Sequence, residues 1–158
     1  MIMNSSDREL RVKPINNGTV IDHIESGQAL NVLKILGIAG HSRYVVSLLM
    51  NVPSGAMGGK DVVKVEDREL EPEEVDTIAL IAPRATINII RNFEVVEKFR
   101  VAMPGEVIGI IKCGNPNCIS NTNEPVSSKF SIESADPVLL RCSYCEFVLD
   151  KNIADHML

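Results

Sequence analysis

The alternation of apolar and polar residues divides the first hundred positions into segments that switch between a strand period and a helix period. Apolar residues flank a polar pair at 20–24, which predicts a short strand. Apolar positions at helical spacing follow at 30–36, where Gly37 ends the predicted helix. A β-branched and leucine-rich run at 43–52 and an alternating segment at 61–66 predict two paired strands.

A turn predicted at 53–55 connects these two strands, and the chain then adds one more helix and two more strands. Pro72 and the acidic residues after it favour the start of a helix, which Pro83 ends. Alternating segments at 86–91 and 94–101 predict strands. The order strand–helix–strand–strand–helix–strand, with one strand added, predicts an α+β fold: a ferredoxin-like antiparallel sheet with two helices on one face.

The pattern changes after Pro104 and Gly105, because short strands and turns replace the longer elements. The predicted strands lie at 107–112, 129–132, 138–141 and 146–149. We therefore predict two domains, at 1–103 and 104–158, the second a small all-β domain. About fifty residues with few large side chains bury little surface, so this domain needs a cross-link to be stable.

Composition narrows the classes of protein that fit. The chain has 158 residues, 45% hydrophobic and 23% charged, as in globular proteins, and only 4% are aromatic, so the core is expected to be aliphatic. A net charge of −5 argues against a protein that coats nucleic acid or anionic membranes. No apolar run reaches the ~18 residues that span a bilayer. Charged residues at 7–9 do not fit a signal peptide, so we expect a cytoplasmic protein without membrane contact.

Four cysteines in the second domain are the strongest chemical signal. Cys113 and Cys118 are separated by four residues, Cys142 and Cys145 by two, and 23 residues lie between the pairs. Each pair fits a tight turn that directs two thiolates at one point, and four tetrahedral sulfur ligands suit structural zinc. An iron–sulfur cluster or a redox pair is the competing interpretation, which the spacing disfavours. Four protein ligands leave the metal no open position for a substrate.

The net charge of the predicted metal-binding domain helps to decide whether its partner is a nucleic acid or a protein. Residues 104–158 hold four basic and seven acidic side chains, a net charge of −3, and few aromatic residues for stacking on bases. A nucleic-acid-binding zinc ribbon is therefore the weaker hypothesis, and a protein–protein interface is the stronger one.

Three lysines are the candidate binding residues of the first domain, which shows no catalytic constellation. Lys60 and Lys64 are four apart on a predicted strand and so project to one face, and Lys98 lies on a later strand. Ammonium groups brought together repel one another unless an anion such as a polyphosphate bridges them. Three separate, solvated lysines are the alternative that the pattern leaves open.

Several motifs, taken together, resemble the regulatory chain of aspartate carbamoyltransferase, in the same order and over nearly the whole chain. They are GTVIDHI at 18–24, NVPSGAMGGKD at 51–61, CGNPNCIS at 113–120 and CSYC at 142–145. The resemblance implies a non-catalytic allosteric subunit of pyrimidine biosynthesis, whose first domain binds CTP or ATP and whose zinc domain contacts the catalytic chain. It also implies regulatory homodimers that bridge catalytic trimers, with CTP as inhibitor and ATP as activator.

The resemblance also implies roles for particular residues. Residues 12–15 would contact the base, Asp22 the ribose hydroxyls, His23 the sugar or phosphates, and Lys98 the triphosphate, while Lys60 and Lys64 would reach the ribose and base. The complete set implied for the nucleotide comprises Val12, Lys13, Pro14, Ile15, Val20, Asp22, His23, Lys60, Val62, Lys64, Asn88, Ile90, Phe93, Val95 and Lys98. The residues implied to face the catalytic chain are Asn115, Asn117 and Glu146.

The chain departs from the best-known members of this family at several of these positions. Asn16 stands where they carry lysine, Phe93 where they carry tyrosine, and Lys13-Pro14 replaces an acidic residue and an alanine. These departures bear on which nucleotide binds and with what effect. The alternative function is a free-standing nucleotide or small-molecule sensor with a zinc-ribbon interaction module.

Overall fold

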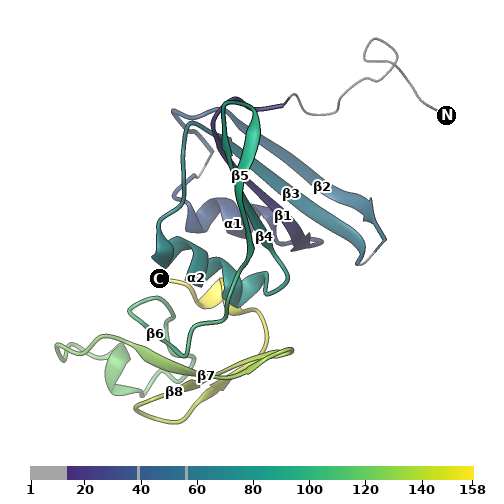
Figure 1. Cartoon of the computed structure of the whole chain (residues 1–158). Helices are drawn as coiled ribbons and strands as arrows, with labels where there is room; N and C mark the ends of the chain where they lie inside the picture. Colours follow the sequence, from purple (N-terminus) through teal and green to yellow (C-terminus); the bar gives the residue numbers. More distant parts are fainter. Residues whose placement is uncertain (1–13, 39, 56) are drawn as a thin grey trace.

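Two antiparallel sheets organise the chain in the computed structural model, which describes residues 14–38, 40–55 and 57–158 (Figure 1). The first sheet and its helices come from residues before 101, and the second sheet lies beyond. The elements of the first part are β1 (Gly18–Glu25), α1 (Ala29–Ile35), β2 (Val46–Ser54), β3 (Gly58–Glu66), α2 (Pro72–Ile81), β4 (Thr86–Arg91) and β5 (Glu94–Arg100).

The first sheet has the strand order β2-β3-β1-β4-β5, and every neighbouring pair is antiparallel. Both helices lie on one face, and the other face is open (Figure 1). Side chains alternate between the two faces of each strand, so one set of residues, such as Ile21, Val63 and Ile87, is fully buried against the helices. The predicted α+β class and ferredoxin-like arrangement are confirmed.

The start of the second helix is fixed by its own sequence. Glu71 and Glu74 form a capping box, and Pro72 occupies the first turn, where a missing N–H costs nothing. Glu74 also accepts a 2.6 Å hydrogen bond from Arg68, whose Nη1 donates to the carbonyl of Leu36 at 2.7 Å. One guanidinium therefore joins the end of α1 to the beginning of α2.

The turn predicted at 53–55 is partly wrong, because β2 continues through Pro53 to Ser54. Pro53 pairs with Gly59 in the register of β2 and β3. Proline cannot donate to a ladder, but β2 is the edge strand of the sheet, so one side of it needs no partner. The edge position, which depends on the whole topology, allows the strand to extend.

The second sheet has the order β6-β7-β8-β9 and belongs to the predicted all-β domain. Gly109 has a φ of 70°, and this turn ends the strand predicted at 107–112 early. Glu146 has a φ of 63°, so the strand predicted at 146–149 is reduced to its last two residues. The elements are β6 (Glu106–Ile108), η1 (Ile119–Asn121), β7 (Lys129–Ala135), β8 (Val138–Cys142), β9 (Val148–Leu149) and η2 (Ile153–His156).

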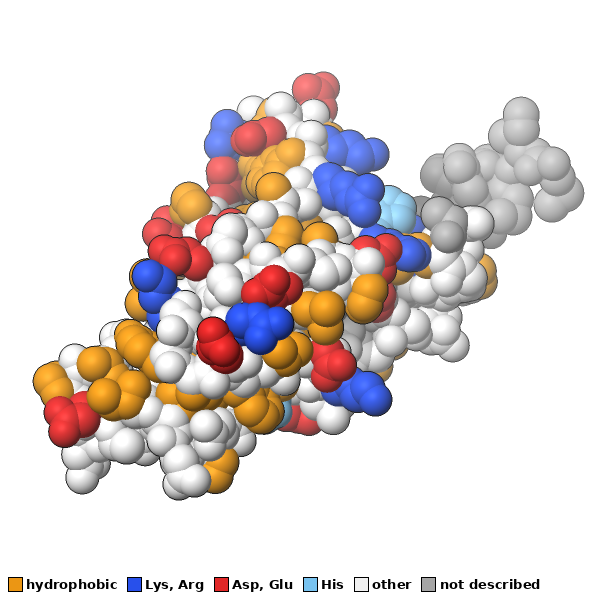
Figure 2. Space-filling view, turned by 90° about the horizontal axis from the view of Figure 1, so that it is seen from below, with side chains coloured by type: hydrophobic (Ala, Val, Ile, Leu, Met, Phe, Trp, Pro, Cys, Tyr) orange, Lys and Arg blue, Asp and Glu red, His pale blue; other side chains and the backbone are white. Residues whose placement is uncertain are grey.

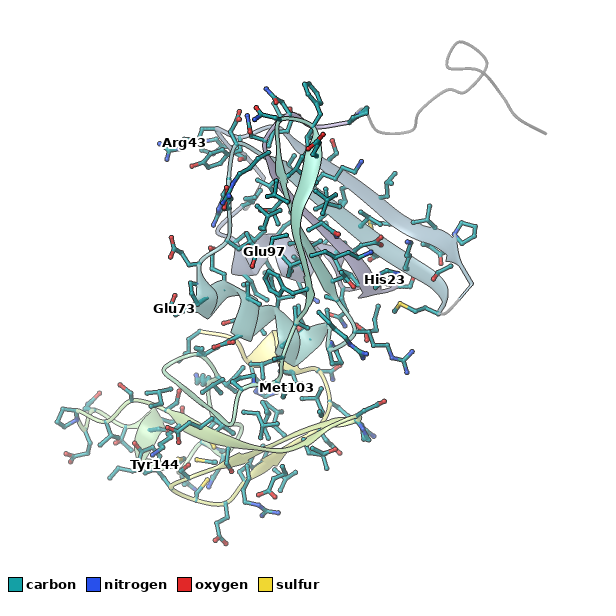
Figure 3. The ribbon with its side chains drawn as sticks, viewed as in Figure 1. His23, Arg43, Glu73, Glu97, Met103 and Tyr144 are labelled. Atoms are coloured by element: carbon teal, nitrogen blue, oxygen red, sulfur yellow. The ribbon has the colours of Figure 1, made fainter. Side chains whose placement is uncertain are left out.

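The two parts share one continuous apolar core at their junction, where α2 packs against η2. Met103 lies in the segment that joins them (Figure 3). A cavity of about 550 Å³ opens beside this contact, between the two helices, the turn after β6 and the last residues of the chain. Residues of both parts of the chain thus line this cavity.

Glu25 lies at this junction, and its contacts do not fully offset the cost of burying its carboxyl group. Burial, with Asp136 across the junction, raises the pKa of the Glu25 carboxyl despite the opposing effects of Arg84 and Arg100, and Glu25 Oε2 is buried with no hydrogen-bond partner among the described residues. A folded-state pKa above the unfolded value means that stability falls as the pH rises through the folded pKa.

We expect Glu25→Gln to stabilise the folded chain at pH 7 by up to about 1 kcal/mol, because it removes a half-buried charge. Urea unfolding of the metal-loaded chain measures this, and the gain should shrink as the pH is lowered through the raised pKa of Glu25. The control is Glu124→Gln, at an exposed position in the loop before β7, which should change stability at neither pH. An unchanged or lower stability of Glu25→Gln at pH 7 would contradict the expectation.

Candidate functional site

The four cysteines converge in the second sheet. Cys113 and Cys118 lie in the loop after β6, Cys142 ends β8, and Cys145 lies in the turn that leads to β9. Their sulfur atoms all lie within 4.8 Å of one another, and all four thiols are free of disulfides. The Sγ–Sγ distances are 3.6 Å for Cys113–Cys145 and 3.7 Å for Cys118–Cys142.

These distances test whether a metal fits. Tetrahedral ligands 2.3 Å from zinc stand about 3.8 Å apart, whereas disulfide sulfurs stand about 2.05 Å apart. The observed sulfur spacings therefore match a tetrahedral metal centre of four thiolates. The four cysteines predicted from spacing are brought together as one metal-binding set.

The loop that carries the first cysteine pair is locked by its own polar residues. Asn121 donates from Nδ2 to the carbonyls of Cys113 and Asn115, at 2.9 and 2.7 Å. Gly114 lies against the ring of Phe147, and a Cβ at this position would stand 2.7 Å from two ring carbons. The ring and the amide thus help to hold the first cysteine pair in place.

The thiols differ in how easily they lose a proton. Burial raises the pKa of Cys113 to about 12 and also raises that of Cys142. Burial also acts on Cys145, but hydrogen bonds from the Phe147 N–H and from Asn115 outweigh it and lower its pKa to about 7. Since metals bind thiolates, binding must displace protons, and affinity falls as the pH falls.

The second candidate site is the open face of the first sheet. Cross-strand partners place Lys64 beside Val20, Val20 beside Asn88, and Asn88 beside Lys98. These four residues form one row across β3, β1, β4 and β5, because directly opposed residues share a face. Asn88 Nδ2 donates to the Val20 carbonyl at 3.2 Å and stiffens the middle of the row.

Asp22 and His23 lie in an irregularity of β1, where the register with β3 shifts between Ile21 and Ile24. His23 has a φ of 57°, and its N–H donates to Asp22 Oδ1 at 2.7 Å. Bulges of this kind re-aim side chains near functional sites. His23 projects from the end of β1 (Figure 3), and its Nδ1 lies 3.1 Å from the hydroxyl of Thr86.

Lys60 forms an ion pair with Asp22, with Nζ 2.9 Å from Oδ1. Burial alone would raise the pKa of the Asp22 carboxyl, but the hydrogen bonds from Lys60 and from the His23 N–H, together with their charges, lower it. Asp22 is therefore an ionised acceptor, oriented by a lysine and a main-chain N–H. Such a group suits hydroxyl donors.

The three lysines do not converge on one point. Lys60 and Lys64 are four residues apart along β3, or roughly 13 Å, and β1 and β4 separate Lys64 from Lys98 by roughly 14 Å. Spread positive charge fits an elongated anion better than a compact one. Figure 2 shows blue Lys and Arg side chains gathered beside a histidine on one flank of the molecule.

The remaining predicted nucleotide residues fall into several classes. Ile15, Val62 and Ile90 are buried, whereas Pro14 and Phe93 are exposed. Val95, 56% exposed, faces Ile90 across β4 and β5. The positions predicted at 12 and 13, Val12 and Lys13, lie outside the described residues.

Sequence reasoning gave no role to two residues that the structure ties to this face. Thr86 holds the ring of His23, and Asp61 lies fully buried directly after Lys60. Asp61 is part of the NVPSGAMGGKD motif, and this motif was the sequence signal that could have pointed to Asp61.

No helix in the described part of the chain is long and apolar enough to cross a membrane.

The comparison with known families gives two separate matches along the chain. Residues 10–102 match the family described as aspartate carbamoyltransferase regulatory chain, allosteric domain. Residues 105–155 match the metal binding domain of the same regulatory chain.

Full-length relatives agree with both matches. The aspartate carbamoyltransferase regulatory chain of Methanocella arvoryzae is 74% identical over 152 residues, covering 96% of this chain and 97% of the relative. Those of Methanothrix thermoacetophila and Haloarcula marismortui are 58% and 54% identical, covering 96% and 99% of this chain and 99% of each relative. The chain therefore belongs to the family of aspartate carbamoyltransferase regulatory chains, non-catalytic subunits with an allosteric and a metal-binding domain.

Proposed function

We propose that the open face of the first sheet binds CTP or ATP and that the chain transmits this binding to catalytic trimers of aspartate carbamoyltransferase. The observation that carries the proposal is the row Lys64–Val20–Asn88–Lys98, flanked by the Lys60–Asp22 pair. It combines two charged ends, an apolar and amide middle, and a carboxylate acceptor. A nucleoside triphosphate needs these same three features in one extended site.

The proposed roles are those that the family resemblance implies, and the positions of the residues are compatible with them. Lys98 on β5 meets the triphosphate, and His23 lies on the phosphate or sugar side. Asp22 accepts hydrogen bonds from the ribose hydroxyls, and this contact competes with Lys60 for the same oxygen. Lys64 and the segment before β1 take the base end. The binding energy comes mainly from charge-assisted hydrogen bonds. The face of the sheet that makes them stays partly exposed to solvent when the nucleotide is bound.

For the metal we propose zinc, in a structural role. All four ligands are thiolates, and the sulfur spacing suits tetrahedral coordination, which zinc prefers. No ligand position remains for a water or substrate.

We also propose that the domain boundary lies at 103/104. We further propose that the chain works in the cytoplasm, where reducing conditions keep the thiols free.

A regulatory chain implies a catalytic-chain partner, and we propose that the metal-binding domain contacts it. Tyr144 lies on this domain, far from the first sheet (Figure 3). Ile119 and Tyr144, each 44% exposed, flank the cysteine loops, beside Asn115, Asn117 and Glu146. Apolar and aromatic side chains exposed on a rigid loop are typical of protein interfaces.

The charges of the metal-binding domain disfavour nucleic acid as its partner. Two of its four basic side chains are paired with carboxylates: Lys129 with Glu106 at 3.5 Å and Arg141 with Glu133 at 2.8 Å. Phosphate binding would have to break these pairs. A protein partner needs no such exchange.

We further propose that two regulatory chains pair through the edge strand β5, whose seven residues are all exposed. Val95 and Val96 are 56% and 50% exposed, and an open edge with apolar side chains is a template for another strand.

We expect Val96→Glu to convert the homodimer to monomers, because it places two carboxylates at the pairing edge. Sedimentation velocity measures this, with Ile108→Glu on the other domain as the control. A variant that remains dimeric at micromolar concentration would contradict edge pairing.

The proposed mechanism is thermodynamic linkage. An effector shifts the complex only through its different affinities for two quaternary states, typically by ~1–3 kcal/mol.

The decisive experiment mixes the chain with the catalytic trimer of its organism and assays the aspartate dependence with CTP and with ATP. We expect each nucleotide to shift the curve, and in opposite directions. A stable homodimer that binds nucleotide but never joins the trimer would instead indicate a free-standing sensor.

A further inference from the structure

Asp61 is a fully buried carboxylate next to the proposed effector site, and no cation pairs with it among the described residues. Both of its oxygens accept hydrogen bonds from main-chain N–H groups. Oδ2 accepts from Gly27 at 3.0 Å and from Ala29 at 3.1 Å, and Oδ1 accepts from Asn51 at 2.8 Å. Burying a carboxylate is costly, so three donors on one group indicate a position that the fold depends on.

The three donors come from three separate segments. Gly27 lies in the turn after β1, Ala29 begins α1, and Asn51 lies where β2 bulges against β3. The residue before α1, Gln28, makes no side-chain cap, so Asp61 supplies the acceptor that a local cap would provide. One side chain of β3 thereby joins the end of β1, the start of α1 and the irregular part of β2.

Lys60 precedes Asp61 and points to the opposite face of the same strand. Its ammonium pairs with Asp22, which lies in the bulge of β1 four residues before the turn that Asp61 holds. The positions of both partners therefore depend on the same anchored backbone. A shift of the turn or of β3 by a few tenths of an ångström would move Lys60 relative to Asp22.

We propose that Asp61 is a positioning residue for effector binding, which sets the place of Lys60 from the buried face of the sheet. This inference rests on the proposed nucleotide site. Asp61 does not touch the effector and acts on its affinity through the Lys60–Asp22 pair. The same anchor reaches α1, whose residues Asn31, Lys34 and Ile35 line the cavity at the domain junction.

The test is a double-mutant cycle on CTP affinity, measured by calorimetry on the metal-loaded full chain. Asp61→Asn keeps the shape but turns one acceptor into a donor, and we expect it to weaken CTP binding about tenfold. In a chain that already carries Lys60→Met, the same change should cost no more than about twofold, because residues that act through one another are not additive. Equal losses in both backgrounds would overturn the proposal.

Two further measurements separate the possible failures. Ser26→Ala removes the Ser26–Asn51 hydrogen bond of 3.2 Å but leaves the three bonds of Asp61, so CTP affinity should not change. In the unsubstituted chain, CTP should slow amide exchange at Gly27, Ala29 and Asn51, which tests the inference even if Asp61→Asn does not fold. Unchanged exchange in a chain that binds CTP would overturn it. A wild-type chain that binds no CTP would instead refute the proposed function.

Discussion

Removal of the metal is expected to unfold the second domain and to release the chain from its catalytic partner. Four cysteine sulfurs that lie within 4.8 Å of one another join loops that share only short strands. Metal binding to such sites supplies roughly 10–16 kcal/mol in small zinc-binding peptides, more than the stability of most domains. Cys113→Ala should have the same effect as a strong chelator. Metal content, circular dichroism and co-elution with the catalytic trimer measure the outcome.

The control is Ser143→Ala, in the turn between Cys142 and Cys145, where the side chain is exposed and supplies no ligand. This variant should keep one metal per chain and full assembly. The first domain of Cys113→Ala should remain folded, because its five-stranded sheet buries side chains such as Ile21, Val63 and Ile87 against its own two helices, and it should still bind nucleotide. A metal-free chain that stays protease-resistant and joins the trimer would show that the metal is dispensable.

Loss of the charge at Lys98 is expected to weaken CTP binding roughly tenfold to a hundredfold, while metal content and assembly stay unchanged. A charge-assisted bond to a phosphate contributes more than a neutral one, and Lys98, at an exposed position, ends the row. Titration calorimetry of Lys98→Ala with CTP measures the loss. The loss should be smaller for a nucleoside without phosphates, since Lys98 is assigned to the triphosphate.

The matched control for Lys98→Ala is Lys151→Ala, an exposed lysine of the metal-binding domain. Both variants change the net charge of the chain equally, so a general electrostatic effect would weaken binding in both. Only the first should lose affinity. Unchanged CTP affinity in Lys98→Ala would remove that residue from the proposed site.

Regular features of this protein can be predicted from local pattern. The alternation along 61–66 and 86–91 places strands because each side chain must choose between core and solvent, and the helix starting at Pro72 carries its own capping box. The cysteine spacing predicts the metal centre for a similar reason. Two tight turns direct four sulfurs regardless of the rest of the fold.

Features that depend on distant partners cannot be predicted in this way. Pro53 lies in a strand only because β2 is at the edge of the sheet, and the bulge at Asp22 and His23 arises from the mismatch between β1 and β3. Asp61 is the clearest case. Its three donors are 34, 32 and 10 residues away, so its role exists only in the folded chain.

The separation of the two cysteine pairs also fixes the order in which a growing chain can mature. The first pair leaves the ribosome 23 residues before the second begins to emerge, and the strand β7 lies between them. Because chains emerge from the N-terminus, the sheet of the first domain can form while the metal centre is still open. The centre can close only once Cys145 is free. If the metal-binding domain contacts the catalytic chain as proposed, a product truncated before Cys142 would keep the first domain but could not join the enzyme.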